Sequence, residues 1–277
     1  MVNFALLQMD IKYCDAEVNF ATAKKMFAEA MQTTPRPDIV VLPEDWSSGF
    51  SDVMFHEQEK HVEPLDGPSI TLLQGLAKEY GVWVVAGSIA TTHADGKMRN
   101  TTFLINREGK VVGDYSKMHL YSDMDEDCKL THGDKMEVYE TELGRFGMMI
   151  CYDIRFGELA RTYALKGADA VIVTSEFPLP RTNHWRTLLT ARAIENQMFI
   201  AACNRVGPGP MGTYCGHSII ISPWGDIIAE GGEEQEVICG SVDFSITADI
   251  RNTIHVFRDR QPETYAKDVL VQPNQFK

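Results

Sequence analysis

The chain has 277 residues, which suits one large domain or two small ones. Its content of 44% hydrophobic and 23% charged residues is typical of a globular protein and excludes disordered and collagen-like classes. The net charge of -13 opposes nucleic-acid phosphates and anionic lipid, so we expect neither as a partner.

The cysteines give no sign of a metal centre or of disulfides. Six are present, but none belongs to a CxxC pair and none has a histidine nearby at the spacing of zinc ligands. The N-terminus lacks a basic stretch followed by an apolar one, and no apolar run reaches the roughly 18 residues that span a bilayer. We therefore expect reduced thiols, no metal, no organic cofactor, no membrane contact and a cytoplasmic protein.

Short runs of β-branched and apolar residues recur along the chain and predict strands. In chain order they cover 4–9, 39–42, 82–86, 102–105, 146–150, 170–173, 199–202, 218–221 and 237–242. Helical patterns separate several of them, because apolar residues fall on one face of the segments 23–31 and 73–80. The alternation of strands and helices predicts an α/β fold.

Signals for helix ends flank one of these strands. Gly167 is expected to end the preceding helix with left-handed backbone, and Thr182 or Asn183 is expected to cap the helix that follows. No Pro-, Gly- or Ser-rich linker divides the sequence, and no internal repeat is found. We expect one domain over 1–257 and a polar tail over 258–277 that packs on the domain or on a partner subunit.

Three polar residues directly follow apolar runs. Glu44 comes after IVVLP, Lys117 after VVGDYS and Cys151 after FGMMI. Ligands of open α/β sheets bind beyond the carboxyl ends of the strands. We therefore expect these three side chains to meet in one pocket.

Each of the three side chains has a chemical role to offer. Cys151 precedes a helical stretch, and a helix N-terminus favours the thiolate form of a nucleophile. Burial beside Pro43 and Trp46 would make Glu44 a stronger general base, and the ammonium of Lys117 can stabilise an oxyanion. Taken singly, each residue also has a plainer interpretation: a buried structural thiol, a solvated loop acid and a surface charge.

Histidine-based chemistry has no local support. None of the eight histidines lies in a motif that marks a catalytic base, and the HExxH zinc motif is absent.

The segments VVLPEDW, DYSKMHL and GMMICYDIRFGEL resemble the three signature segments of the nitrilase superfamily of carbon–nitrogen hydrolases. The likeness covers nearly the whole chain. It implies a catalytic triad of Glu44, Lys117 and Cys151 and a fold in which two sheets and two helical layers form a four-layer α-β-β-α sandwich. Gly157 departs from the RFPE sequence that is frequent in the family, which leaves the start of the following helix open.

The resemblance implies a second acid soon after the catalytic lysine. We assign this role to Glu126, with Asp125 as the choice if the alignment shifts by one residue and a solvated acidic loop as the alternative. Members of the superfamily commonly form homodimers through helical faces. The segments 156–166 and 187–197 are candidates for that contact, unless their apolar faces simply cover the sheet.

Two longer stretches resemble bacterial ω-amidase-like members of the superfamily: EFPLPRTNHWRTLLTARAIENQMFIAACNRVG and CGHSIIISPWGDIIAEGGEEQE. This resemblance implies hydrolysis of a small-molecule amide, 2-oxoglutaramate or 2-oxosuccinamate, through a cysteine thioester with release of ammonia. N-carbamoyl amino acid amidohydrolase and nitrilase activities are alternatives that would use the same triad. A non-catalytic binding protein on the same fold is an alternative of another class.

Further residues are expected to bind the substrate. The backbone N–H of Tyr152 would help to hold the oxyanion. Arg155 and Arg181 would bind a substrate carboxylate in this acidic protein, unless either is structural; Arg155 could pair with Asp153 or Glu158 instead. Phe177 would form a wall of the pocket, or belongs to the core.

Overall fold

The computed structural model describes residues 1–50, 57–209 and 212–266. The strands of the first sheet are β1 (Val2–Gln8), β2 (Ile39–Val41), β3 (Glu63–Pro64), β4 (Trp83–Val85), β5 (Ile89–Thr92), β6 (Met98–Ile105), β7 (Val111–Ser116) and β16 (Glu236–Val242). Their order is β16-β1-β2-β4-β6-β5-β3, with β7 on the far side of β6. Strands β1, β2 and β4 are parallel to one another.

A second sheet and a hairpin contain the other described strands. The sheet has the order β15-β14-β11-β10-β9-β8, and β12 pairs with β13. The bounds are β8 (Tyr139–Thr141), β9 (Gly144–Ile150), β10 (Ala170–Ser175), β11 (Phe199–Asn204), β12 (Val206–Gly209), β13 (Gly212–Cys215), β14 (Ile219–Ile221) and β15 (Ile227–Glu230). Strands β9, β10 and β11 are parallel.

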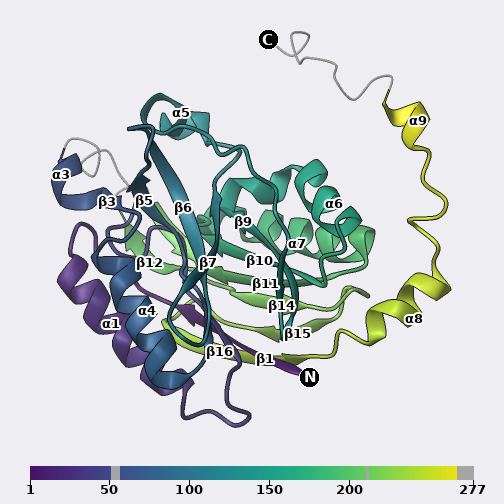
Figure 1. Ribbon diagram of the computed structural model, residues 1–277, viewed down its shortest axis with the longest axis horizontal. Helices are drawn as coiled ribbons and strands as arrows, with labels where there is room; N and C mark the ends of the chain where they lie inside the picture. The colour runs from purple at the N-terminus through teal and green to yellow at the C-terminus, as the bar shows by residue number, and fades with distance from the viewer. Residues whose placement is uncertain (51–56, 210–211, 267–277) are drawn as a thin grey trace.

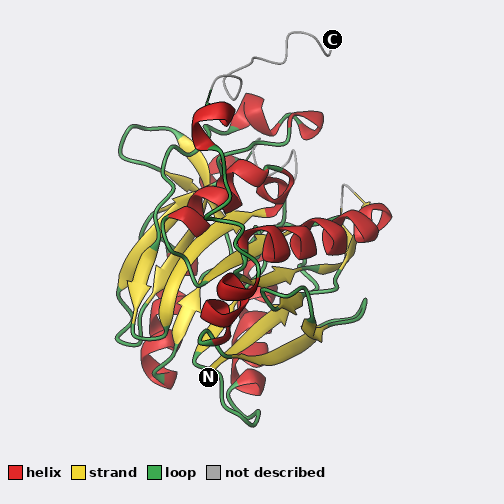
Figure 2. Ribbon diagram, turned by 90° about the vertical axis from the view of Figure 1, so that its right-hand side faces the viewer, coloured by secondary structure: helices red, strands yellow, loops and turns green. Residues whose placement is uncertain are grey.

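Helices cover the outer faces of both sheets. Helices α1 (Ala16–Ala30) and α4 (Pro68–Tyr80) pack on the first sheet, and α6 (Gly157–Leu165) and α7 (Thr182–Asn196) pack on the second (Figure 1). Figure 2 shows the layers from the side. The predicted four-layer α-β-β-α sandwich is confirmed.

Short helices complete the described structure. They are α3 (Gln58–His61), α5 (Glu126–Lys129), α8 (Ile246–Thr253) and α9 (Pro262–Tyr265), with 3-10 turns η1 (Ser122–Met124), η2 (Cys151–Arg155) and η3 (Leu179–Arg181).

The apolar strands are buried on both of their faces. In β1, Phe4 and Leu6 face the second sheet, whereas Ala5 and Leu7 pack under the helices, as expected from the two-residue period of a strand. Phe4 meets Phe146 of β9 edge to face, with 6.2 Å between the ring centroids. Burial on both faces explains why these strands are continuous apolar runs in the sequence.

All the strands predicted from apolar runs are present, although their ends differ; β6, for example, begins at Met98. Gly167 adopts the expected left-handed backbone, with φ of +84°. The predicted N-cap of the next helix was wrong. Helix α7 begins at Thr182, whose hydroxyl donates to the carbonyl of Leu179 at 2.8 Å, because the turn η3 already leads into the helix.

A close backbone contact fixes the segment that follows β2. Gly87 has a φ of +62°, and a Cβ at this position would lie 2.2 Å from the carbonyl oxygen of Pro43. Only glycine permits this approach. The loop after β4 therefore packs closely against the chain directly before Glu44.

The described part of the predicted tail makes little contact with the sandwich. Residues 261–266 are exposed, and α9 lies apart from the two sheets in Figure 1. The rest of the predicted tail, 267–277, lies outside the described residues.

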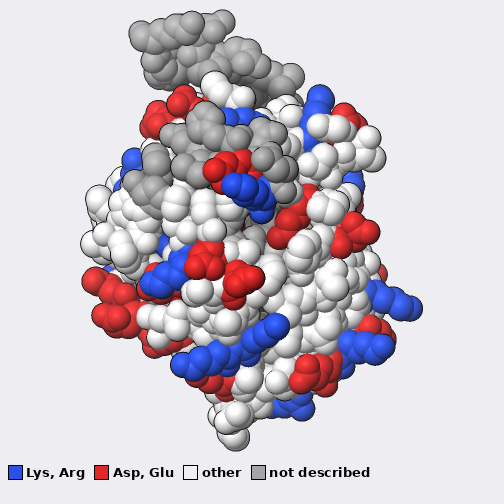
Figure 3. Space-filling view, turned by 90° about the vertical axis from the view of Figure 1, so that its left-hand side faces the viewer, with Lys and Arg blue, Asp and Glu red and all other residues white. Residues whose placement is uncertain are grey.

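Surface charge shows no basic face over α1 and α4. Lys and Arg alternate there with Asp and Glu (Figure 3). Among the described helices, none is long and apolar enough to cross a membrane.

Candidate active site

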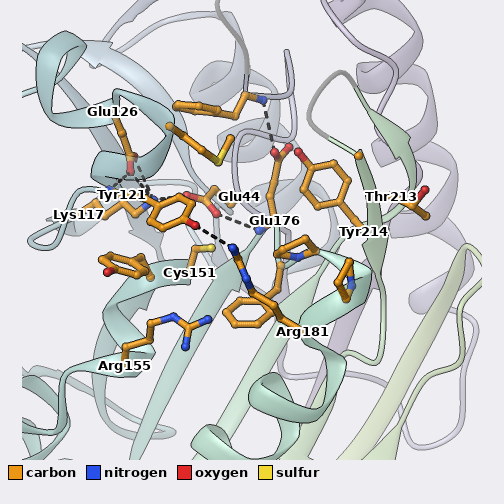
Figure 4. A pocket seen from close by; sticks show the side chains of 17 residues that line it. Glu44, Lys117, Tyr121, Glu126, Cys151, Arg155, Glu176, Arg181, Thr213 and Tyr214 are labelled. Atoms are coloured by element: carbon orange, nitrogen blue, oxygen red, sulfur yellow. Dashed lines mark hydrogen bonds and ion pairs between the residues drawn. The ribbon is translucent and has the colours of Figure 1, made fainter.

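One cavity of about 350 Å³ gathers every residue that the sequence analysis placed at the site (Figure 4). They are Glu44, Lys117, Glu126, Cys151, Tyr152, Arg155, Phe177 and Arg181. The wall also contains Phe50, Tyr121, Met124, Glu176, Pro178, Pro180, Gly212, Thr213 and Tyr214. The catalytic and binding roles of these residues remain predictions, but their convergence is a feature of the structure.

Strand ends bring the reactive groups to this cavity. Glu44 follows β2, Lys117 follows β7, and Cys151 follows β9. Glu44 and Lys117 are 3% and 4% exposed, so water is largely excluded from their charged groups.

The ammonium of Lys117 lies between two carboxylates. Its Nζ is 3.0 Å from Oε1 of Glu44 and 3.0 Å and 2.9 Å from the two oxygens of Glu126. An ammonium has three protons, so these contacts use all of them. Burial alone would lower the pKa of Lys117, but Glu126 and Glu44 together raise it well above the usual value. Lys117 is therefore a fixed cation.

Glu126, rather than a neighbouring acid, contacts the lysine. It is 1% exposed and also accepts a hydrogen bond from the backbone N–H of Tyr121 at 2.7 Å, whereas Asp125 and Asp127 are exposed. Burial raises the pKa of Glu126, and Lys117 opposes that shift.

Cys151 sits in a sharp turn between β9 and η2. Its φ of +45° lies in the left-handed region, which costs a non-glycine residue on the order of 1–3 kcal/mol. Asp153 holds this turn, because its Oδ2 accepts the N–H of Ile150 at 2.9 Å and the hydroxyl of Tyr115 at 2.7 Å. Its Oδ1 accepts the backbone N–H of His119 at 3.0 Å. The strained turn at Cys151 is thus held in place by Asp153.

The surroundings of Cys151 disfavour the thiolate form. Burial, followed by the Glu44 carboxylate, raises the pKa of Cys151 well above its usual value, while Lys117 acts in the opposite direction. The expectation of a favoured thiolate was therefore wrong. It assumed a helix directly after Cys151, whereas the chain first makes the 3-10 turn η2, and α6 begins only at Gly157. The thiol needs a base.

The guanidinium groups of Arg155 and Arg181 differ in their contacts. The guanidinium of Arg155 forms no hydrogen bond or ion pair with the described residues; its Cζ lies 5.8 Å from the ring centroid of Tyr152 and 5.4 Å from that of Phe177. The predicted alternative, a pair with Asp153 or Glu158, was wrong, since other groups occupy the Asp153 carboxylate.

Arg181 is partly engaged by the wall. Its Nη2 donates to the hydroxyl of Tyr121 at 2.9 Å, and its guanidinium lies 5.5 Å from the centroid of the same ring. Phe177 is part of the core and also of the pocket wall, because it is 2% exposed, packs on Trp185 and lines the cavity.

Two polar partners of Glu44 were missed in the sequence. Asn100 donates from Nδ2 to Oε1 of Glu44 at 2.9 Å, and the backbone N–H of Glu176 donates to Oε2 at 2.9 Å. Glu176 follows the apolar strand β10, so the rule that found Glu44 and Cys151 would also have found it. Asn100 lies inside β6 and has no such signal.

The described residues contain no cluster of side chains that could bind a metal ion. Within 1–50, 57–209 and 212–266, no group of three or more His, Cys, Asp or Glu side chains is arranged to hold an ion.

Comparison with known proteins agrees with this geometry. The model of the carbon–nitrogen hydrolase family matches residues 3–252. The chain belongs to the carbon–nitrogen hydrolase family. The resemblance to the nitrilase superfamily is thereby confirmed.

Relatives of this hydrolase include amidases. It is 38% identical to the 2-oxoglutaramate amidase of Bacillus subtilis, over 94% of this chain and 97% of the relative. It is 32% identical to the omega-amidase NIT2 of Homo sapiens, over 96% and 97%. Among solved structures it is similar to Saccharomyces cerevisiae Nit3, a member of branch 10 of the nitrilase superfamily, with a TM-score of 0.85 and 31% identity over 94% and 96% of the chains.

The hydrolase also buries a carboxyl group that has no hydrogen-bond partner among the described residues. Asp45, next to Glu44, is 1% exposed, and neither of its carboxylate oxygens has a hydrogen-bond partner among the described residues. Burial, then Glu44 and Glu176, raises its pKa well above the usual value. Asp45 is therefore held as a neutral acid over a wider pH range than a free aspartate.

Replacement of this acid by Asp45→Asn should change how stability depends on pH. The folded protein keeps the Asp45 proton above the unfolded pKa of about 3.9, so this group's contribution to the free energy of unfolding is lost as pH rises through the raised pKa. The variant lacks this loss. Its stability relative to wild type, followed in urea titrations, should therefore increase as pH rises above about 3.9, by up to about 1.4 kcal/mol per pH unit, until the raised pKa is passed.

Asp66→Asn, which makes the same substitution at an exposed position away from the cavity, is the control. A constant difference for Asp45→Asn would show that Asp45 is ionised in the folded protein.

Proposed function

We propose that this hydrolase cleaves the terminal amide of 2-oxo dicarboxylic acid monoamides, 2-oxoglutaramate or 2-oxosuccinamate, and releases ammonia. The observation that carries the proposal is a cavity in which Cys151 lies beside a buried carboxylate and a buried ammonium, with two arginines in the same wall. The likeness to a protein named 2-oxoglutaramate amidase supports the choice of substrate.

Acylation begins with proton transfer from Cys151 to Glu44. The thiolate attacks the amide carbon, and the carbonyl oxygen becomes an oxyanion held by the backbone N–H of Tyr152 and by Lys117. Protonated Glu44 then donates its proton to the amide nitrogen, the C–N bond breaks, and ammonia leaves a thioester on Cys151.

Deacylation uses the same carboxylate. Glu44 takes a proton from water, the hydroxide attacks the thioester carbon, and the proton returns to the sulfur as the dicarboxylate leaves. No external reductant, oxidant or cofactor is required for this balance.

Lys117 reaches the oxyanion by exchanging partners. Its three protons are all bound to carboxylate oxygens, two of them to Glu126. One Glu126 contact is given up when the oxyanion forms. Glu126 then balances the charge of the ammonium through the remaining bond.

Arg155 and Arg181 bind the carboxylate at the far end of the substrate. The guanidinium of Arg155 has no other ionic partner among the described residues, and that of Arg181 has only a phenol. A charge-assisted bond to a substrate carboxylate suits both groups. The oxo-acid end thereby faces the arginines and the amide faces the sulfur.

We also infer a cytoplasmic location. The six cysteines all lie in the described residues and form no disulfide with one another, which supports a reducing compartment. Recovery of the protein in the cytosolic fraction of its host is the check.

Removal of a catalytic group should abolish or sharply reduce turnover. Cys151→Ala should form no covalent adduct with substrate in intact-mass spectra and release no ammonia. Glu44→Gln and Lys117→Ala should reduce kcat by roughly 100-fold or more, because each removes a proton-transfer or charge-stabilising group.

Glu79→Gln and Lys78→Ala, on the exposed face of α4, are matched controls that should retain wild-type kcat. Full activity in Glu44→Gln or Lys117→Ala would refute the assigned roles. A panel of 2-oxo acid amides, ureido acids and nitriles, scored by ammonia release, separates the proposed activity from N-carbamoyl hydrolysis and nitrilase activity. No turnover and no iodoacetamide labelling of Cys151 would favour a binding protein.

Loss of either arginine should weaken binding of anionic substrates. Arg155→Ala and Arg181→Ala should raise KM for 2-oxoglutaramate by roughly 10- to 100-fold, as expected for one charge-assisted hydrogen bond. KM for a neutral amide of similar length should not change. Arg258→Ala, whose guanidinium pairs with Asp259 on the surface, is the control. Unchanged KM in both site variants would remove the proposal for the arginines.

We infer that two copies pair through α6 and α7, with the described part of the tail, 258–266, against the partner. The sheet-facing sides of both helices are buried, as the alternative interpretation required. Apolar groups nevertheless remain outside: Ile194 is 49% exposed, and Trp224, beside the turn at Gly225 that touches Ile194, is 50% exposed. Such a patch favours burial against a second copy.

Light scattering should give twice the 31.1 kDa mass of one chain for the wild type. Ile194→Glu should yield the monomer, because a buried unpaired carboxylate is costly at an interface. Val111→Glu, a change of the same kind at an exposed position of β7, should remain dimeric. A monomeric wild type would contradict the inferred pairing.

A further inference from the structure

The two oxygens of Glu44 are not equivalent. Oε1 accepts hydrogen bonds from Lys117 at 3.0 Å and from Asn100 at 2.9 Å. Oε2 accepts a hydrogen bond from the backbone N–H of Glu176 at 2.9 Å. A carboxylate oxygen has room for about two donors, so Oε2 is the oxygen left with capacity for the Cys151 proton. The direction of that oxygen is set by Glu176.

The side chain of Glu176 fixes its own backbone. Glu176 is 6% exposed, and its Oε1 is 3.0 Å from Nη1 of Arg205. Its Oε2 accepts the backbone N–H of Phe50 at 3.4 Å. The carboxylate therefore joins the end of β10 to the segment that follows Glu44.

Arg205 is anchored in turn. It is 1% exposed, its Nη2 donates to the carbonyl of Ile11 at 2.7 Å, and the ring of Tyr214 lies 4.3 Å from its guanidinium carbon. Its backbone N–H donates to the carbonyl of Ser175 at 3.1 Å, next to Glu176. The cation that pairs with Glu176 thus has little freedom to move.

We propose that Glu176 is a positioning residue: its carboxylate, paired with Arg205, fixes the backbone N–H that aims Oε2 of Glu44 at Cys151. This rests on the proposed role of Glu44 as the base. The carboxylate of Glu176 does not itself exchange a proton with the substrate.

The positioning should depend on pH. The groups that face Glu176 are Arg205, Glu44, Asp45 and Tyr214. Burial raises the pKa of Glu176 to about 7, with Arg205 opposing and Glu44 adding to the shift. The ionised form makes the pair with Arg205. As pH falls through about 7, Glu176 gains a proton, the pair weakens, and the N–H loses its fixed position.

The test measures alkylation of Cys151 by iodoacetamide, followed at the peptide level by mass spectrometry, because this reaction needs the base but not an amide substrate of the proposed class. Glu176→Ala should slow alkylation at about pH 8 by roughly five- to tenfold, the loss expected when one orienting hydrogen bond is weakened. It should lower kcat by a similar factor and leave KM unchanged.

Glu176→Gln keeps the shape and the neutral contacts of the side chain. Because it is neutral like the protonated acid, it should show at about pH 8 the reduced alkylation rate that the wild type shows below pH 7, and it should lack the further decrease near pH 7. Glu158→Ala, which removes an exposed carboxylate on α6, is the control and should match the wild type throughout. Melting temperatures show whether each variant is folded.

Wild-type alkylation and kcat in Glu176→Ala would overturn the proposal. If that variant does not fold, an unchanged decrease near pH 7 in Glu176→Gln overturns it instead. Failure of the wild type to hydrolyse 2-oxo acid amides refutes only the substrate assignment. Undiminished alkylation in Glu44→Gln refutes the base role, and the positioning proposal with it.

Discussion

A buried ammonium shared by two carboxylates is the interaction on which the site depends. Taking an ion out of water costs several kcal/mol, and only close, fully bonded partners offset that cost. Lys117 meets this condition, because each of its protons has a carboxylate oxygen at about hydrogen-bond distance. The ends of β2 and β7 and the turn of α5 are therefore tied to one atom. None of them can shift without leaving a charge unpaired.

The buried surroundings of Lys117 contain more acidic side chains than cationic ones. Glu44, Asp45, Glu126 and Glu176 are buried near one another, and the buried cations beside them are Lys117 and Arg205. Burial and mutual repulsion raise the pKa of Asp45, Glu126 and Glu176. The cluster thus retains protons at a pH where free carboxyl groups would have released them, which suits a reaction that moves a proton in each step.

The sequence predicted the parts of this arrangement that follow from local chemistry. Strands buried on both faces, such as β2, β9 and β10, contain apolar runs, and Glu44, Cys151 and Glu176 follow them, whereas Lys117 follows β7, which is partly exposed. Short strands such as β3, β5 and β8 have weak patterns, so they were not expected. Asn100 could not be found, since its role depends on the register of β6 against its neighbours.

The state of the thiol was also out of reach of the sequence. A helical pattern after Cys151 indicated a dipole, but the chain first makes a 3-10 turn, and the burial that governs the thiol arises from distant segments. Likewise, Arg155 has acids beside it in the sequence, yet Asp153 is turned inward by its bonds to Ile150 and Tyr115. Proximity along the chain gave no guide to pairing here.

The bond between Tyr115 and Asp153 crosses from one sheet of the sandwich to the other. Tyr115 belongs to β7, two residues before the cation, and Asp153 lies two residues after the sulfur. A rigid phenol ring thereby acts as a spacer of constant length between the segment of Lys117 and the segment of Cys151. The distance between the two sheets therefore sets the width of the space that an amide must enter. A shift of one sheet relative to the other would change the geometry of the site even if every reactive side chain were kept.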